Sequence, residues 1–197
     1  TGINGQDGSY LTEHLLSMNF EVGGLVRRSS VAENQTYRIN HLNNDIKTYY
    51  GDLIDRSSIV KALKDFKPDY VFNFLAISEI EKCEKNKTKC KKVIFDSFKR
   101  ALKVSKKYNC KFVHMSTDAV YNEKNKNNSE TSKLGYRNYY TYLKIICEKH
   151  LVKNYSNYLI LRGRFFGYSL TKKNFFEQIL YKLKKNQRID CYENMFS

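Results

Sequence analysis

Short apolar runs alternate with amphipathic segments along most of the chain. Short runs of β-branched and aromatic residues predict strands, whereas longer segments with apolar residues every three or four positions predict helices. The predicted strands span residues 21–26, 46–50, 70–75, 110–115 and 158–161. The predicted helices span residues 57–66, 91–108, 139–154 and 175–185. Strands that alternate with helices indicate parallel β-α-β units, so we expect an α/β protein with a doubly wound, mostly parallel sheet of the Rossmann type.

Individual positions predict the burial, the capping and the connecting loops of these elements. The near-continuous apolar run at 70–75 is typical of a strand that is covered on both faces. Ser57 stands where it can cap the helix at 57–66. The polar stretch 123–132 is expected to form a surface loop at the ligand edge of the sheet. We expect the inner side of the long helix at 91–108 to consist of Ile94, Phe98, Ala101, Leu102 and Ser105.

Three glycines open the chain, Gly2, Gly5 and Gly8, with the spacing GxxGxxG. Such a turn lets the backbone approach a pyrophosphate while the N-terminus of the next helix faces its charge. The alternative is an ordinary glycine-rich turn. The helix after the turn is expected to bury one side, formed by Leu11, Leu15 and Leu16.

The end of the strand at 21–26 bears on the choice of cofactor. A free ribose 2′-hydroxyl usually meets an acidic residue at this point, but the chain has Arg27 and Arg28 there. Two guanidinium groups suit a 2′-phosphate, so NADP is favoured over NAD. The alternative is a solvated basic turn. Asp52, which follows the next strand, could hold the adenine edge or cap the following helix.

Candidate catalytic residues follow in the second half. Tyr140 and Lys144 are four residues apart, so both lie on one face of a helix. We expect the ammonium to stabilise the phenolate and bring the pKa of Tyr140 towards neutrality, so that the phenol can exchange a proton with a carbonyl or alcohol. Thr117 follows a strand at the carboxyl edge of the sheet and can orient the same substrate oxygen. The alternative for 116–118 is turn capping by short polar side chains.

The composition narrows the kinds of partner, metal and compartment that we expect for this protein. The net charge of +15 comes from lysines spread over the chain and mixed with asparagine, so we expect no nucleic-acid partner and only a general attraction for anionic ligands. The five cysteines have no CxxC spacing and no histidine at metal-ligand spacing, so we expect reduced thiols, a cytoplasmic protein and no metal. No apolar stretch approaches the length of a membrane span.

Together these residues resemble the extended short-chain dehydrogenase/reductases that act on nucleotide sugars. The first half resembles the GDP-mannose 4,6-dehydratases in segments 1–11, 27–30, 38–42 and 50–53. The active-site half resembles the dTDP-4-dehydrorhamnose reductases in segments 73–76, 82–84 and 116–121.

The resemblance implies a nucleotide-sugar substrate, with Thr117, Tyr140 and Lys144 as the catalytic residues. It also implies a homodimer, because the helices that begin at Lys91 and Tyr139 build the dimer interface of the family. The implied cofactor-binding residues are Gly2, Gly5, Gln6, Asp7, Gly8, Arg27, Arg28, Asp52, Leu53, Ala76, Tyr140 and Lys144.

One departure from the family affects the expected reaction. Dehydratases of this family place a glutamate shortly after the catalytic threonine, whereas this chain has Asp118 and Ala119. We therefore expect NADP(H)-dependent reduction of a 4-keto sugar, or epimerisation, rather than elimination of water. A GDP-mannose dehydratase-like enzyme and a catalytically silent dinucleotide-binding module are the alternatives. A second departure is Ile94, where many relatives have asparagine.

The resemblance also suggests a domain division. Residues 1–168 are expected to form the NAD(P)-binding domain and residues 169–197 to begin a substrate-binding region. Because the glycine turn needs a strand before it and the last residues close no element, we interpret the sequence as an internal fragment. We expect it to lack the first strand and most of the C-terminal lobe.

Overall fold

The computed structural model describes residues 1–27, 38–52, 55–77, 79–121, 127–163 and 175–189. The strands are β1 (Val22–Val26), β2 (Ile46–Tyr50), β3 (Tyr70–Asn73), β4 (Lys111–Met115) and β5 (Tyr158–Leu161). The helices are α1 (Gln6–Ser17), α2 (Arg56–Phe66), α3 (Ile80–Lys85), α4 (Lys87–Lys91), α5 (Ser97–Lys107), α6 (Tyr139–Asn154) and α7 (Phe175–Lys184). All five predicted strands and all four predicted helices are confirmed.

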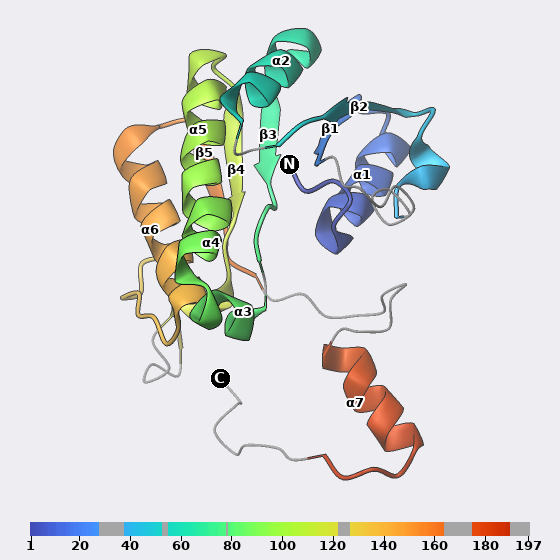
Figure 1. Ribbon diagram of the computed structural model, residues 1–197, viewed down its shortest axis with the longest axis vertical. Helices are drawn as coiled ribbons and strands as arrows, with labels where there is room; N and C mark the ends of the chain where they lie inside the picture. The colour runs from blue at the N-terminus through green and yellow to red at the C-terminus, as the bar shows by residue number, and fades with distance from the viewer. Residues whose placement is uncertain (28–37, 53–54, 78, 122–126, 164–174, 190–197) are drawn as a thin grey trace.

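The strands pair in parallel, as predicted, and form two sheets within the described part of the chain. One sheet has the order β1-β2 and the other β3-β4-β5, with β4 in the middle. Helices α5 and α6 lie side by side on one face of the three-stranded sheet (Figure 1). A cavity of about 650 Å³ is lined by residues of both sheets, from β1, β2 and β3, together with residues of α1 and α2. The α/β class with a parallel Rossmann-type arrangement is therefore confirmed.

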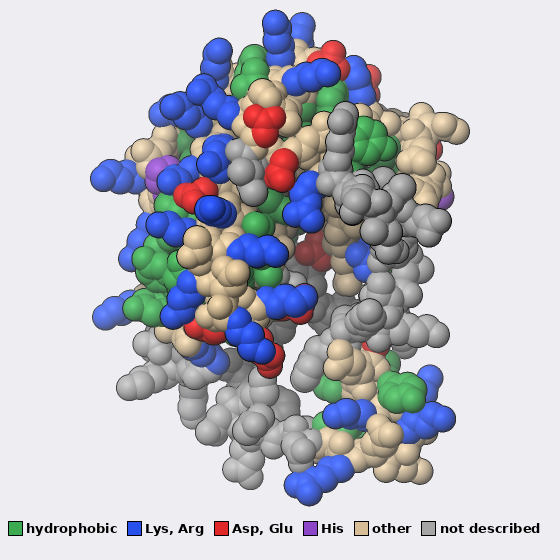
Figure 2. Space-filling model, in the orientation of Figure 1, with side chains coloured by type: hydrophobic (Ala, Val, Ile, Leu, Met, Phe, Trp, Pro, Cys, Tyr) green, Lys and Arg blue, Asp and Glu red, His purple; other side chains and the backbone are tan. Residues whose placement is uncertain are grey.

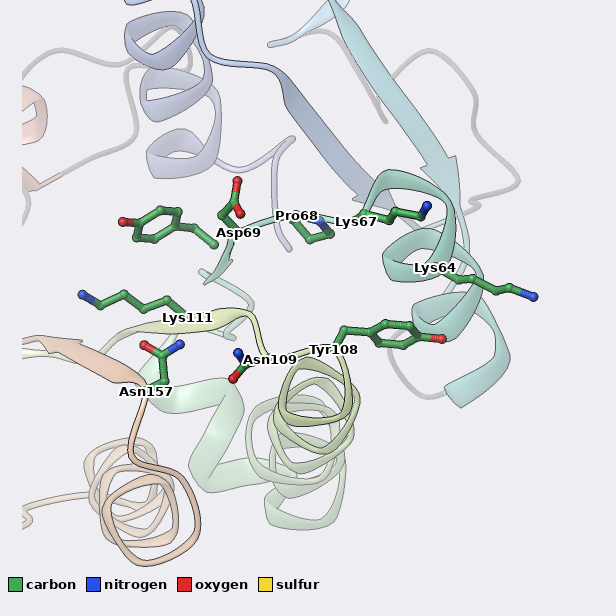
Figure 3. Close-up of a pocket in the computed structure, with 9 residues that line it drawn as sticks. Lys64, Lys67, Pro68, Asp69, Tyr108, Asn109, Lys111 and Asn157 are labelled. Carbon is green, nitrogen blue, oxygen red and sulfur yellow. The ribbon is translucent and has the colours of Figure 1, made fainter.

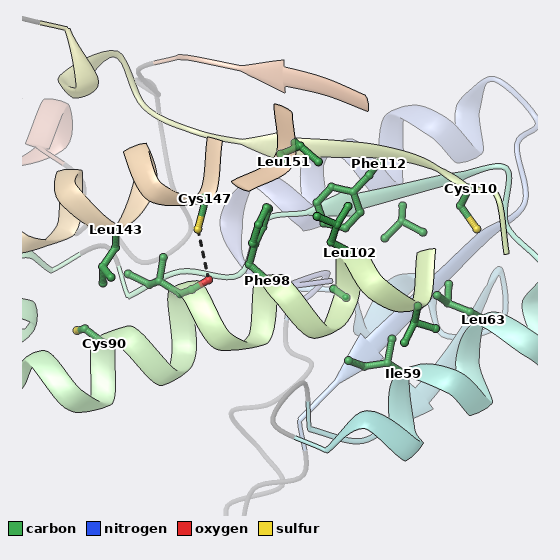
Figure 4. Close-up of a cluster of buried hydrophobic side chains, with 14 of the residues drawn as sticks. Ile59, Leu63, Cys90, Phe98, Leu102, Cys110, Phe112, Leu143, Cys147 and Leu151 are labelled. Carbon is green, nitrogen blue, oxygen red and sulfur yellow. Dashed lines mark hydrogen bonds between the residues drawn. The ribbon is translucent and has the colours of Figure 1, made fainter. Parts of the chain in front are cut away.

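The main core lies between the three-stranded sheet and helices α5 and α6. Phe98 of α5 is 1% exposed, and its ring packs edge-on against Phe112 at 5.6 Å and His114 at 4.9 Å between centroids. Figure 4 shows Phe98 and Leu102 directed from α5 towards Phe112 and Leu151. The predicted inner side of the long helix is confirmed, since all of its members are buried: Ile94, Phe98, Ala101, Leu102 and Ser105.

Three local predictions differ from the structure. Asp55, not Ser57, caps α2, because its carboxylate accepts from the N–H groups of Ser57 and Ser58. The long helix is not α-helical throughout: it contains a π-helical turn at Lys92–Asp96 between α4 and α5, and the Ser97 hydroxyl donates to the Lys92 carbonyl at 3.0 Å. In α1 the predicted apolar residues are only half-buried, and the fully buried positions are Gly8, Ser9 and Thr12.

Basic side chains cover the visible face without gathering on one element (Figure 2). Lysines and arginines lie beside acidic and apolar side chains over most of that face, in agreement with their spread along the sequence. Within the described residues, no helix is both long and apolar enough to cross a membrane.

Candidate active site

The glycine turn leads directly into α1. Gly2 has a φ of +72°, a conformation that favours glycine, and the Gly5 N–H donates to the Gly2 carbonyl at 2.9 Å. A Cβ at Gly8 would overlap the Gly2 carbonyl oxygen and lie 2.8 Å from Ile3 Cα, so α1 packs on the turn only with glycine there. Gly5 is the N-cap and has no side chain to satisfy the first-turn N–H groups, which include those of Gln6 and Asp7. Such donors at a helix N-terminus bind anions.

The carboxyl edges of β1 and β2 lie beside this turn. The Gly51 N–H donates to the Val26 carbonyl at 2.9 Å, which places Asp52 next to the exposed Arg27. Asp52 does not cap α2, because that position is taken by Asp55. Two further predicted cofactor contacts, Arg28 and Leu53, lie outside the described residues.

The end of β3 meets the glycine turn from the other side. A Cβ at Gly2 would lie 3.3 Å from Phe74 Cβ and 3.4 Å from the Leu75 backbone nitrogen. Ala76, two residues past Phe74, is half-buried and packs against the main core. The structure therefore brings Ala76 to the same edge as the glycines.

Helix α6 presents the predicted tyrosine and lysine in its first two turns. A reciprocal capping box fixes its start, in which the Asn138 side chain accepts from Thr141 N and the Thr141 hydroxyl accepts from Asn138 N. Lys144 is 2% exposed, and its Nζ donates to the Met115 carbonyl at 2.7 Å, at the end of β4. The same Nζ lies 5.8 Å from the centroid of the Tyr140 ring.

The pKa of Tyr140 is shifted in the opposite direction from the prediction. Burial lowers the pKa of Lys144 to about 8, although Cys147, Glu148 and Asp7 oppose the shift. Burial raises the pKa of Tyr140 to about 12, and the negative groups of Cys83, Asp7 and Asp118 add to it. The prediction that Lys144 brings the pKa of Tyr140 towards neutrality is therefore wrong for this structure. Desolvation of the phenolate dominates, and the Lys144 ammonium is directed to the Met115 carbonyl.

Asp7 links the glycine turn to the tyrosine and lysine. Burial raises the pKa of its carboxyl, while the positive charges of Lys144 and Arg38 lower it. Asp7 also acts on the pKa of both Tyr140 and Lys144, although it belongs to α1 and they belong to α6. The predicted cofactor end and the predicted catalytic end therefore lie close together.

Thr117 lies at the same edge, just past β4. Its hydroxyl oxygen accepts from Ala119 N at 3.3 Å and so caps the short 3₁₀ turn Asp118–Val120. The hydroxyl also lies 3.3 Å from the Asp118 carboxylate, to which it can donate. The turn-capping interpretation is thus correct, and it places Thr117 and Asp118 at the edge that Tyr140 faces.

A buried ionic network beside this site was not predicted from the sequence. Glu148 is 2% exposed and forms a two-pronged ion pair with Arg162, with a shortest N–O distance of 2.7 Å. Glu148 also accepts a short hydrogen bond from the Ser116 hydroxyl. One sequence signal could have revealed the buried position of Glu148. Glu148 follows Lys144 by four residues, so both side chains lie on the same, inward face of α6.

A surface hollow of about 750 Å³ lies away from these residues (Figure 3). Its lining includes Asp69, Lys111 and Asn157, at the amino ends of β3, β4 and β5. In open parallel sheets, ligands bind at the carboxyl ends of the strands, so we do not assign this hollow to the active site. Among the described residues, no cluster of three or more histidine, cysteine or acidic side chains could hold a metal ion.

The parallel α/β fold, the glycine turn and the tyrosine–lysine pair define a dinucleotide-binding domain of the extended short-chain dehydrogenase/reductase class. The family model described as GDP-mannose 4,6 dehydratase matches residues 1–169, so the chain belongs to that family. GDP-mannose 4,6 dehydratase 1 of Arabidopsis thaliana is 49% identical over 88 residues, which are 41% of this chain and 24% of that protein. The human GDP-mannose 4,6 dehydratase is 44% identical over 89 residues, covering 41% of this chain and 23% of its own length. The matched segment thus spans about a quarter of these curated relatives.

Solved structures share the fold over more of the chain. A UDP-N-acetylglucosamine 4-epimerase from Methanobrevibacter ruminantium M1 has a TM-score of 0.79 at 23% identity, covering 97% of this chain and 63% of its own. A hypothetical dTDP-4-dehydrorhamnose reductase from Sulfolobus tokodaii has a TM-score of 0.68 at 27% identity, covering 86% of this chain and 56% of its own. The Thermus thermophilus UDP-glucose 4-epimerase, solved with NAD, has a TM-score of 0.70 at 23% identity, covering 82% of this chain and 52% of its own.

Proposed function

We propose that the complete protein is an NADP(H)-dependent oxidoreductase that transfers hydride between the nicotinamide and a carbon, C4, of a nucleotide-activated sugar. The observation that carries this proposal is the single edge at which Asp7, in the first turn of α1, lies close enough to Tyr140 and Lys144 to shift the pKa of both. The relatives support the substrate class, since those named above are a GDP-mannose dehydratase, UDP-sugar epimerases and a hypothetical dTDP-sugar reductase.

We assign cofactor binding, substrate orientation and proton transfer to different residues of the site. NADP supplies the hydride when it is bound. The N–H groups at the start of α1 would bind its pyrophosphate, Arg27 would bind the 2′-phosphate, and Lys144 would hold the nicotinamide ribose. Thr117 orients the sugar oxygen, and Tyr140 exchanges a proton with it.

Tyr140 is present at neutral pH in the protonated form that carbonyl reduction requires of a proton donor. At neutral pH a phenol with a pKa of about 12 carries its proton and can donate it to a ketone oxygen that gains hydride at its carbon. Elimination of water needs in addition a base near the sugar, and Ala119 supplies none where dehydratases have a glutamate. We therefore propose reduction of a 4-keto sugar.

A dehydratase acting on GDP-mannose is the second candidate. It is favoured by the family model and by the curated relatives, which carry that name. Asp118 is then the carboxylate that would serve as the base, since it lies 3.3 Å from the Thr117 hydroxyl and contributes to the raised pKa of Tyr140.

The first test of the proposed function is NADPH oxidation by the full-length protein with a panel of nucleotide 4-keto sugars. Binding of NADPH without oxidation of it on any of them would favour a silent binding module.

Replacing both Arg27 and Arg28 with alanine is expected to weaken NADPH binding much more than NADH binding. Each charge-assisted contact to the 2′-phosphate contributes about 1.5–3 kcal/mol, and NADH lacks that phosphate. Fluorescence titration with both cofactors measures the difference. The control is Lys64→Ala with Lys111→Ala, which removes two charges at the opposite edge of the strands. Equal losses for NADPH and NADH would remove the arginines from this role.

We further propose that the complete protein is a homodimer and that residues 169–197 begin its substrate-binding region. The helical segments 91–108 and 139–154 are the pair that the family uses for its dimer interface, and α5 contacts α6 here. Light scattering of the full-length protein at micromolar concentration is expected to give twice the monomer mass. A monomer mass would refute the assembly.

A further inference from the structure

Two side chains of helix α6 form hydrogen bonds with two consecutive residues, Met115 and Ser116, at the end of β4. Lys144 donates to the Met115 carbonyl at 2.7 Å, and Glu148, one helical turn later, accepts from the Ser116 hydroxyl. Thr117 is the next residue of the chain. The backbone that carries Thr117 is therefore tied to the helix that carries Tyr140 at two adjacent points.

Arg162 fixes the carboxylate that makes the second of these contacts. Its Nε lies 3.2 and 3.1 Å from the two oxygens of Glu148, and its Nη2 lies 2.7 Å from one of them. The fork geometry of a guanidinium holds a carboxylate in one orientation. The Glu148 side chain is 3% exposed and that of Arg162 16%, so water competes little for these bonds.

The same guanidinium reaches the segment that follows Thr117. Its Nη1 donates to the Tyr121 hydroxyl at 3.1 Å and to the Glu130 carbonyl at 2.8 Å. The 3₁₀ turn after Thr117 ends at Val120, whose carbonyl accepts from Gly135 N at 2.9 Å. The Thr117 turn is thus anchored on its upstream side by Ser116 and on its downstream side through Arg162.

We propose that Glu148 is a positioning residue that, with Ser116 and Arg162, sets the distance between the Thr117 hydroxyl and Tyr140. This inference rests on the proposed function, in which both groups meet one sugar oxygen. One oxygen of Glu148 contacts both Ser116 and Arg162, so the carboxylate joins the catalytic strand to the guanidinium. The hydrogen bond from Ser116 is the contact in this network that holds the backbone next to Thr117 in place relative to α6.

Ser116→Ala tests the inference, because it removes this bond and leaves the ion pair of Glu148 and Arg162 in place. The control is Ser97→Ala, which removes one hydrogen bond of a similarly buried serine, to the Lys92 carbonyl. In the full-length enzyme we expect Ser116→Ala to lower kcat at least about tenfold, with KM for NADPH within about twofold of wild type, because small displacements in a catalytic constellation are costly. Both variants should lower Tm by similar amounts. Ser116→Thr, which keeps the hydroxyl, should recover most of kcat.

Crystal structures of the NADP complexes give a readout that needs no turnover. The separation of Thr117 Oγ1 and Tyr140 Oη is expected to change by about 0.5 Å or more in Ser116→Ala and to stay unchanged in Ser97→Ala. An unchanged separation in Ser116→Ala would overturn the inference, as would a kcat equal to that of Ser97→Ala. If the wild-type enzyme turns over no nucleotide sugar, the proposed function fails, and the separation alone still decides whether Glu148 positions Thr117.

Discussion

Tyr140→Phe is expected to lower kcat by about 10²–10⁴-fold while NADP binding stays within about twofold of wild type. The substitution removes only the phenolic proton and leaves the ring in its half-buried position on α6. A group that acts only in the transition state affects kcat and kcat/KM together. Steady-state NADPH oxidation and fluorescence titration of the cofactor, both on the full-length protein, measure the two quantities.

Tyr142→Phe is the matched control for that variant. Tyr142 lies two residues further along α6 and is 37% exposed, so it shares the helix but not the inward face. It should retain wild-type kcat. Equal activity of Tyr140→Phe and Tyr142→Phe would remove Tyr140 from the mechanism.

Lys144→Met is expected to abolish turnover and to change how stability depends on pH. The pKa of Lys144 is lowered from 10.5 to about 8, so between these values the unfolded chain holds a proton that the folded chain lacks. The free energy of unfolding of the wild-type protein therefore carries a contribution that rises as the pH increases from about 8 to about 10.5. Below pH 8 the full cost of burying the charge is present, on the order of 3 kcal/mol.

Denaturant unfolding at pH 7.5 and pH 10.5 measures this effect. The methionine variant lacks the titrating group, so its free energy of unfolding should gain about 3 kcal/mol less than that of wild type over the interval. Other groups that titrate in this range are common to both proteins and cancel in the comparison. Lys149→Met, an exposed position on the same helix, should behave as wild type. Identical pH dependence in wild type and Lys144→Met would show that the ammonium is not buried.

The sequence predicted much of the fold because its elements carry local signals. The limits of β2 (Ile46–Tyr50), β5 (Tyr158–Leu161) and α6 (Tyr139–Asn154) agree with the predicted ones to the residue. β5 is a continuous apolar run between Asn157 and Arg162, and β2 begins at Ile46 directly after Asp45. The alignment of the glycine turn with Tyr140 and Lys144 at one edge followed from the rule that parallel strands end at a common edge.

Other features depend on contacts between distant residues and could not be read from local pattern. The π-helical turn at Lys92–Asp96 has no sequence period of its own. The raised pKa of Tyr140 depends on burial by surrounding elements, whereas the spacing to Lys144 alone indicated the opposite direction. The partnership of Glu148 with Ser116 and Arg162 joins three segments, and only the helical spacing from Lys144 hinted at it.

The central claim is hydride transfer to a sugar without elimination of water, and incubation with GDP-mannose tests it most directly. The full-length protein is supplied with GDP-mannose and catalytic NADP, and the 4-keto-6-deoxy product is sought by mass spectrometry. Because Ala119 offers no carboxylate where dehydratases have a glutamate, we expect no such product, whereas NADPH should be consumed with a nucleotide 4-keto sugar. Clear formation of the 4-keto-6-deoxy product would contradict the claim and would make Asp118 the base to test next, through Asp118→Asn.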